Sequence, residues 1–410
     1  RGAACLEQAG YPVEHLDLNG VTDFETILRP FAAQSRSTVF GLTATTPQMP
    51  TAARIVAVLR DVRPDARVIL GGPHVTLTHA ARRRELKFGV TGRATRSFDG
   101  LLHLFDVLVV GDGEDAIFEA IHDGAPKVVD ADDPHTALFM TSKRYGEMPF
   151  PARHLVDVSS YHYSIEGVPA ISLIAQLGCP FACAFCGGRS SPMLRKIRTR
   201  TTESILAEVR HLHEQYGVRG FMFFDDELNV NKSVVSLMNA IADLSQELGT
   251  EFKLRGFVKA ELFNEEQARA MYRAGFRWLL CGFESGSPRI LENINKKAAR
   301  EDNTRCMTIA HDHGFKVKAL MSLGHAGESA ETVAETKGWL LENRADDFDA
   351  TIITVFPGCP YYDEAVETAP GVWTFTARSG DRLHTNEIDF SRDHAFYKGI
   401  PGEYKSFTFT

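Results

Sequence analysis

The sequence predicts an α/β protein made of a Rossmann-like, doubly wound parallel sheet, a TIM-like partial β/α barrel and a small C-terminal region. Short apolar strands alternate with helices in the first 125 residues, and the alternation restarts at Ala170 with longer helices. Glycine-rich or acidic turns follow most of these strands. Because ligands of parallel sheets bind at the carboxyl ends of the strands, these turns are the expected positions of a binding site.

Residues 1–125 form the first predicted unit. We expect strands at 38–42, 68–70 and 107–110, and helices at 51–60 and 116–121. Residues 3–9 resemble the end of a helix, so we expect the chain to begin inside this domain. Residues 126–165 are rich in Pro, Asp and His, and we predict that they form a linker.

Residues 166–360 form the second predicted unit, the partial barrel. Its six expected strands lie at 171–175, 221–224, 252–258, 278–283, 316–323 and 349–356. Its expected helices lie at 202–216, 234–248, 265–274, 302–313 and 331–341. The alternation ends after 360, and we predict that the aromatic-rich segment 361–410 caps the barrel or contacts substrate.

Composition excludes several classes of protein. The chain has 410 residues, 44% hydrophobic and 24% charged, and a net charge of −8, which argues against a nucleic-acid partner. We find no apolar run of membrane-spanning length and no signal peptide, and expect a cytoplasmic protein without a membrane partner. Three of its seven cysteines lie within eight residues, which favours a metal site in a reducing compartment over disulfides.

Those three cysteines are Cys179, Cys183 and Cys186, spaced C-x3-C-x2-C. Three thiolates can bind three corners of a [4Fe-4S] cluster and leave the fourth iron open for another ligand. The alternative is a zinc site, which needs a fourth ligand such as His162 or His211.

The cysteine loop resembles the signature of the radical S-adenosylmethionine (SAM) superfamily, including the aromatic Phe185 before the last cysteine. The resemblance implies that SAM binds the open iron and that one electron from the cluster cleaves it to a 5′-deoxyadenosyl radical. Segments 225–226, 282–287, 324–329 and 356–360 resemble the family's other strand-end motifs, although Leu177, Ala326 and Cys359 depart from the usual residues. The implied SAM-binding residues are Phe185, Gly187, Asp225, Asp226, Glu284, Ser285, Gly324, Phe356 and Pro357.

The three strand-end turns of the first unit resemble those of the cobalamin (B12)-binding domain that precedes many radical SAM barrels. The implied cobalamin-binding residues are Thr43, Thr45, Thr46, Gly71, Gly72, Pro73, His74, Gly111, Gly113 and Glu114. Small hydroxyl and glycine residues suit a bulky planar ligand, since it requires close approach of the backbone. The alternative is a doubly wound domain that is vestigial or binds a nucleotide, but no G-x-G-x-x-G or Walker A pattern follows a strand.

Together, the resemblances imply a cobalamin-dependent radical SAM methyltransferase. Its methyl group would pass from SAM through methylcobalamin to an unactivated carbon of a small molecule or natural-product precursor, an aromatic carbon such as one in tryptophan being one option. A one-electron donor such as flavodoxin or ferredoxin is the implied protein partner. Two alternatives remain: non-methylating ring or cyclase chemistry with the same cofactors, and a cofactor-binding module without turnover.

Overall fold

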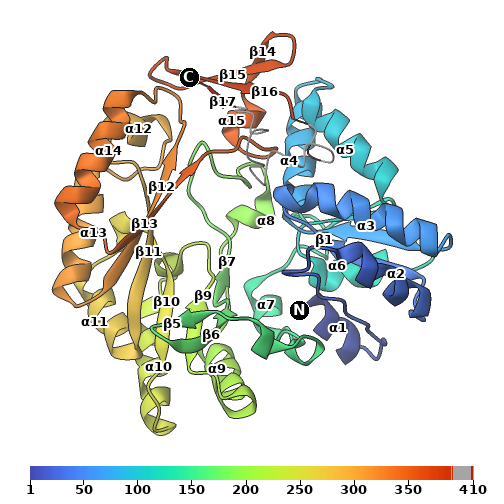
Figure 1. The fold of residues 1–410 in the computed structure, drawn as a ribbon, viewed down its shortest axis with the longest axis horizontal. Helices are drawn as coiled ribbons and strands as arrows, with labels where there is room; N and C mark the ends of the chain where they lie inside the picture. Colours follow the sequence, from blue (N-terminus) through green and yellow to red (C-terminus); the bar gives the residue numbers. More distant parts are fainter. Residues whose placement is uncertain (389, 391–407, 410) are drawn as a thin grey trace.

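The computed structural model describes residues 1–388, 390, 408 and 409, which form a parallel sheet, a larger and mainly parallel sheet, a small antiparallel sheet and a two-stranded antiparallel pair. In Figure 1 the first sheet and its helices lie on the right, in blue, and the large sheet lies on the left. Their arrangement confirms the predicted α/β class. None of the helices in the described part of the chain is long and apolar enough to cross a membrane.

The first sheet has four parallel strands in the order β1-β2-β3-β4. The strands are β1 (Val39–Thr43), β2 (Arg67–Gly71), β3 (Val107–Val110) and β4 (Val128–Asp130). The helices of this region are α1 (Gly2–Gln8), α2 (Phe24–Gln34), α3 (Met49–Val62), α4 (Pro73–Lys87), α5 (Arg93–Leu104) and α6 (Gly113–Ala120). β4 belongs to the segment that we expect to be a linker, as does helix α7 (Ser142–Glu147).

The second sheet has seven strands in the order β13-β12-β11-β10-β9-β6-β5. Six are parallel, and β5 pairs antiparallel with β6. Since β5 and β13 are the two ends of this sheet, the barrel is partial. The strands are β5 (Ser164–Ile165), β6 (Val168–Leu173), β9 (Gly220–Phe223), β10 (Lys253–Val258), β11 (Phe276–Glu284), β12 (Lys316–Leu323) and β13 (Asp347–Ile352).

Helices cover the outside of the partial barrel. They are α9 (Thr202–Tyr216), α10 (Val234–Glu247), α11 (Glu265–Ala274), α12 (Pro288–Asn293), α13 (Arg300–Asp312) and α14 (Ala330–Asn343). Local signals set their ends: the Thr201 side chain caps the first turn of α9, and Gly217, with φ of 64°, ends it. Ile205, Val209 and Leu212, at helical spacing, are buried in the barrel core.

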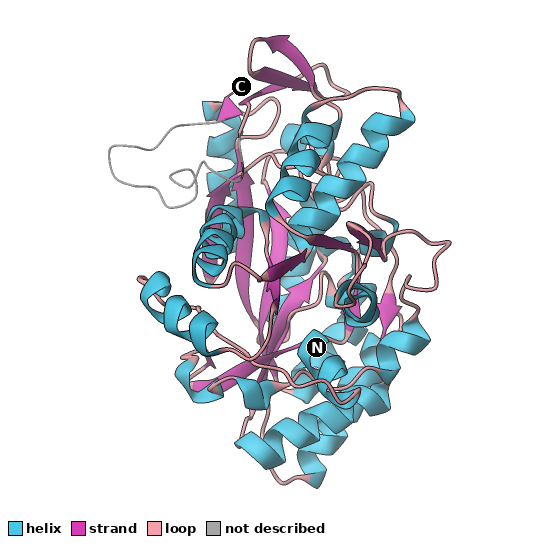
Figure 2. Ribbon diagram, turned by 90° about the vertical axis from the view of Figure 1, so that its right-hand side faces the viewer, coloured by secondary structure: helices cyan, strands magenta, loops and turns pink. Residues whose placement is uncertain are grey.

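Two short strands and a one-turn helix surround the cysteine loop, in the middle of the molecule (Figure 1). They are β7 (Gln176–Leu177), α8 (Pro192–Arg195) and β8 (Arg198–Thr199). After the barrel come helix α15 (Pro360–Asp363) and strands β14 (Val366–Ala369), β15 (Val372–Thr376), β16 (Arg382–Asn386) and β17 (Thr408–Phe409). These strands form the antiparallel sheet at the top of Figures 1 and 2. The rest of the predicted C-terminal region, residues 389, 391–407 and 410, lies outside the described residues.

A buried ion cluster joins the segment before the barrel to helix α9. The Glu208 carboxylate, 1% exposed, accepts hydrogen bonds from Arg153 (2.7 Å) and Arg200 (2.5 Å). Both arginines need a negative charge there, because removal of one partner leaves the others charged and poorly solvated.

We therefore expect Glu208→Gln to lower the free energy of unfolding by about 3–5 kcal/mol, measured by urea titration of the apo chain. Glu247→Gln is the matched control: its partner Arg210 is 2.7 Å away, but both side chains are exposed. Glu247→Gln should lower the free energy of unfolding by less than about 1 kcal/mol. Equal losses for the two variants would contradict the assigned role of Glu208.

Candidate functional site

The cysteine loop is folded by contacts with its own flanking segments. Gly178 has φ of +88°, and a Cβ there would lie 2.1 Å from the carbonyl oxygen of Lys196, so only glycine fits. The backbone N–H of Gly178 donates to the Asp226 carboxylate (2.8 Å), and that of Cys179 donates to the Leu194 carbonyl (2.9 Å). The loop is therefore held in place independently of any bound cluster.

The three cysteine thiols interact with one another. Burial raises the pKa of Cys179 to about 11 and also raises the pKa of Cys183 and Cys186. The thiols of Cys183 and Cys179 raise the pKa of Cys186 further. Cys186 still contacts solvent. Since iron binds thiolates, loading this loop must release protons.

The thiols fit a cluster better than a single ion. Among the residues that the structure describes, no three or more His, Cys, Asp or Glu side chains stand close enough to share one metal ion. A cubane needs less crowding, because each cysteine binds a different iron. The ring of His211, one of the two histidines considered for a zinc site, packs on Phe150 and Tyr216.

An arginine beside the loop has buried donors without a hydrogen-bond partner among the described residues. Arg189 follows the last cysteine closely, and its pKa is lowered by burial and by nearby Arg195. Its Nε and Nη1 atoms are buried and have no hydrogen-bond partner among the described residues. Unpaired buried donors are costly, and an anionic or carbonyl group of a bound cofactor would satisfy them.

Asp225 and Asp226, predicted to bind SAM, lie directly after β9, and both fasten the backbone that leads into the loop. Asp225 is 2% exposed and accepts hydrogen bonds from the backbone N–H groups of Ala175 (3.1 Å) and Gln176 (2.5 Å). Burial raises its pKa to about 7, although the two hydrogen bonds oppose the shift. Contact of Asp225 and Asp226 with SAM stays a prediction. Both carboxylates do hold the backbone that leads into the cysteine loop.

Glu284 ends β11, and its side chain keeps some solvent exposure, 14%. It accepts hydrogen bonds from Lys296 (3.2 Å) and Ser322 (2.8 Å). Ser285, by contrast, is buried, and its hydroxyl is within hydrogen-bond distance of Thr336 Oγ1 in α14 (2.9 Å). Glu284 is therefore the more available of the two for a ligand.

The remaining predicted SAM residues come from three separate loops. A Cβ on Gly187 would lie 2.9 Å from the Phe356 ring, so these two predicted positions touch. Gly324 has φ of +89°, and its N–H donates to Glu328 (3.2 Å). Phe185 packs on Ile290, Leu291 and Ile294 in the α12 region. Contact of Pro357 with SAM stays a prediction.

Several charged residues near the loop were missed by sequence reasoning. Lys259 lies over the Phe181 ring (4.2 Å) and pairs with Glu261 (2.5 Å). Burial raises the pKa of Glu227 to about 7, while Lys296 and Lys259 oppose the shift. Lys259 and Glu261 follow β10 closely and Glu227 follows β9, which is the signal that could have found these three residues.

The predicted cobalamin residues lie at the carboxyl ends of the first sheet. A Cβ on Gly72 would lie 2.5 Å from Thr43 Oγ1, so glycine lets the first two turns touch. Thr46 Oγ1 is 3.1 Å from Nδ1 of His74, which is 1% exposed. Gly111 has φ of +87°, and its N–H donates to Thr76 (3.0 Å). At Gly72 and Gly111 the absence of a side chain therefore lets neighbouring turns of the chain pack closely against the backbone.

The other predicted members of that set flank the same turns. Thr45 caps the short helix that starts at Thr46, and Pro73 begins α4 directly after Gly71 and Gly72. Gly113 and Glu114 begin α6. Contact of all of these residues with cobalamin remains a prediction.

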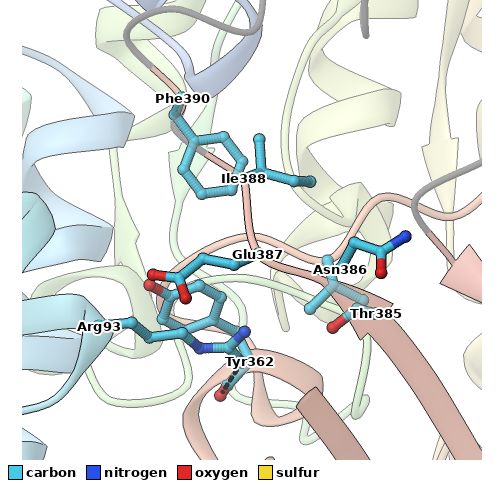
Figure 3. Close-up of a pocket in the computed structure, with 8 residues that line it drawn as sticks. Arg93, Tyr362, Thr385, Asn386, Glu387, Ile388 and Phe390 are labelled. Atoms are coloured by element: carbon cyan, nitrogen blue, oxygen red, sulfur yellow. Dashed lines mark hydrogen bonds between the residues drawn. The ribbon is translucent and has the colours of Figure 1, made fainter. Parts of the chain in front are cut away.

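The cysteine loop and the first domain meet directly. Arg198, 1% exposed, pairs with Asp112 in the turn after β3. Leu77 of α4 packs closely against Gly187 and Gly358, since a Cβ on either glycine would lie 3.1 Å or less from the Leu77 side chain. Farther out, Arg93 of α5 donates to the Tyr362 carbonyl (2.6 Å), in a small pocket also lined by Glu387 and Phe390 (Figure 3). The two predicted cofactor sites therefore share one interface.

The burial of His74 predicts a dependence of stability on pH. Burial lowers its pKa to about 4, from an ordinary value of 6.5. Below pH 6.5 the unfolded chain binds a proton that the folded chain does not, so this contribution to stability is lost as the pH falls from about 6.5 toward 4. At pH 5 the loss is about 2 kcal/mol.

Between pH 7 and pH 5 the free energy of unfolding of the unaltered chain falls. In His74→Gln we expect this fall to be smaller by about 2 kcal/mol. Urea titrations at the two pH values measure it. His135→Gln, at an exposed position, should leave the difference unchanged. A His74→Gln variant with the full pH dependence would refute this explanation.

Comparisons with known proteins support the two-domain interpretation. Residues 173–340 match the family model of the radical SAM superfamily, and residues 3–102 match that of the B12 binding domain. An uncharacterized methyltransferase of Pyrococcus horikoshii is 28% identical over 331 residues, which are 80% of this chain and 69% of that protein. An anaerobic magnesium-protoporphyrin IX monomethyl ester cyclase of Rubrivivax gelatinosus is 24% identical over 80% of this chain and 58% of its own length.

The fold is similar to that of a solved structure. The radical SAM methyltransferase TsrM from Kitasatospora setae, with cobalamin and a [4Fe-4S] cluster bound, has a TM-score of 0.69 and 21% identity, covering 92% of this chain and 77% of that one. At this identity the likeness concerns the fold. With both family models matched in this order, the chain contains a B12-binding domain followed by a radical SAM domain, and its cofactors are a [4Fe-4S] cluster, SAM and cobalamin.

Proposed function

We propose that the protein is a cobalamin-dependent methyltransferase that moves a methyl group from SAM to a carbon of a small molecule. The observation that carries this proposal is the shared interface: the turn after β3 contacts the segment after the cysteine loop through Arg198 and Asp112. A methyl group must travel between SAM and cobalamin, so the two sites have to be adjacent. The names of the Pyrococcus relative and of TsrM agree with this activity.

Each set of residues has a task in this proposal. Cys179, Cys183 and Cys186 hold the cluster, and Glu284 orients SAM beside it. When bound, the cluster supplies an electron, SAM the methyl group and the organic radical, and cobalamin a carrier for the methyl group. Asp225 and Asp226 keep the loop in position through backbone hydrogen bonds.

Buried apolar residues at the interface exclude water from the chemistry. One cluster combines Ala81 and Ala94 of the first domain with Ala184 of the cysteine loop and Tyr361 of α15. Radical and methyl-transfer reactions both need water kept out, since it competes with the acceptor.

The acceptor is the finer part of the proposal. A structure of TsrM, 22% identical, contains tryptophan substrate and a SAM analogue. We propose an unactivated carbon in a small molecule or natural-product precursor, with an aromatic carbon as one option. A one-electron donor such as flavodoxin or ferredoxin would reduce the cluster.

The decisive experiment uses SAM with a deuterated methyl group. We expect the anaerobically reconstituted protein, supplied with reductant and this SAM, to place the label on its bound cobalamin, detected by mass spectrometry. Label-free cobalamin together with release of 5′-deoxyadenosine would instead favour ring chemistry, in line with the cyclase relative. Neither product would favour a binding module without turnover.

The cluster ligands are tested separately. We expect Cys183→Ala to lose most of its bound iron and its brown absorption after reconstitution, because two thiolates cannot hold a cubane stably. Iron analysis and visible absorption measure this. Cys5→Ala is the control, since Cys5 is buried against Met148 in another part of the chain. A Cys183→Ala variant with normal iron content would overturn the ligand assignment.

A further inference from the structure

A continuous chain of four hydrogen-bonding groups ends on the Glu284 carboxylate. Ser322, near the end of β12, donates to Glu284 Oε2 (2.8 Å), and Ser322 Oγ also lies 2.7 Å from His325 Nε2. His325 Nδ1 lies 3.1 Å from the hydroxyl of Tyr361 in α15. His325 is 0% exposed and Tyr361 is 1% exposed, so water does not replace these partners.

The second oxygen of the Glu284 carboxylate faces a lysine. Its Oε1 pairs with Lys296 Nζ at 3.2 Å. Burial alone would lower the pKa of Lys296, but the Glu284 and Glu227 carboxylates outweigh burial and raise it. Lys296 is therefore a cation, and the Glu284 carboxylate beside it is an anion that can only accept hydrogen bonds.

The acceptor at one end fixes the direction of the whole chain. The single hydroxyl hydrogen of Ser322 is donated in the hydrogen bond to Glu284, so the Ser322 oxygen must accept a hydrogen bond from His325 Nε2–H. Burial lowers the pKa of His325 to about 4, so the ring is neutral and carries one proton. With that proton on Nε2, Nδ1 must accept from the Tyr361 hydroxyl. The other tautomer would oppose two lone pairs at 2.7 Å.

The position of Glu284 itself needs such support. Its φ is +65°, a left-handed conformation that is unfavourable for a residue with a Cβ. A Cβ on Gly282 would lie 2.7 Å from Glu284 Oε1, so the carboxylate lies across a glycine. Hydrogen bonds from two sides hold the side chain there.

His325 also touches the cysteine loop. Its ring meets that of Phe185 in an edge-to-face contact, with centroids 5.4 Å apart and an angle of 61° between the planes. Phe185 directly precedes the predicted cluster ligand Cys186. One side chain therefore contacts both the support of Glu284 and the loop that holds the cluster.

We propose that His325 is a positioning residue of the SAM site: through Ser322 it orients the Glu284 carboxylate toward the bound SAM. This inference rests on the proposed role of Glu284 as a SAM contact. His325 does not touch SAM in this proposal, and it transfers no proton. Its donor Nε2–H and its neutral charge are the properties that matter.

The test measures SAM affinity by equilibrium dialysis of the reconstituted, anaerobic protein without reductant, so that SAM is not cleaved. We expect His325→Phe, which keeps a ring but has no donor, to weaken binding about fivefold to tenfold. Ser322→Ala should weaken it by a similar factor. The double variant should be no weaker than Ser322→Ala alone, because His325 acts through Ser322.

Conservative and distant substitutions serve as controls. His325→Gln keeps an N–H donor near the position of Nε2, and its SAM affinity should return to within about twofold of the unaltered chain. His135→Phe, at an exposed position, should bind SAM normally. Equal visible absorption of the cluster in all variants shows that each has folded.

Several results would overturn the inference. One is normal SAM affinity in His325→Phe, and another is a His325→Gln variant that binds SAM as weakly as His325→Phe. A third is a double variant whose loss of SAM affinity equals the product of the two single losses. A second measurement does not depend on variant folding: nitrogen-15 NMR of labelled histidines should show the His325 ring neutral with its proton on Nε2, and a proton on Nδ1 would be contradictory. If Glu284→Gln binds SAM normally, the role of Glu284 is wrong and the inference falls with it; if Glu284→Gln is weak and His325→Phe is not, the inference alone fails.

Discussion

The buried carboxylate of Asp132 is the interaction on which the meeting of the two domains depends. It follows β4 of the first sheet, is 0% exposed, and accepts hydrogen bonds from the Ser191 hydroxyl (2.6 Å) and the Met193 N–H (2.9 Å) beside α8. It also pairs with Arg83 of α4. An unpaired carboxylate there would be very costly, so these three partners must stay together. The start of α8, just after the cysteine loop, is thereby fixed against the first domain.

Charge is unusually concentrated around the cysteine loop. Lys259 and Lys296 lower the pKa of Cys183, while Glu227 and Glu284 raise it. Burial is the largest effect on each of the three thiols. A cluster with thiolate ligands carries negative charge, and two nearby ammonium groups stabilise it electrostatically. Structural ion pairs such as Arg153 with Glu208 lie elsewhere, where they hold segments together.

Sequence reasoning worked best where the signal is local. The C-x3-C-x2-C spacing and the glycine turns after strands are short patterns, and the strand alternation predicted both parallel sheets. It did less well for β4, whose three residues are too few to show a period, so we expected a linker there. The position of Asp225 after a strand was clear from sequence, but its hydrogen bonds to Ala175 and Gln176 were not, since fifty residues separate donor and acceptor.

By itself, the sequence determined the fold class, the grouping of three thiols and the placement of polar turns at strand ends. These follow from side-chain chemistry and periodicity over a few residues. Only the tertiary structure decided which groups face one another: Arg198 with Asp112, and Glu284 with Ser322 and His325. Such pairs depend on how strands and loops pack, and a buried charge or hydroxyl takes whichever partner packing brings near. The positions of reactive residues can therefore be found in a sequence, whereas their hydrogen bonds and charge state depend on the folded chain.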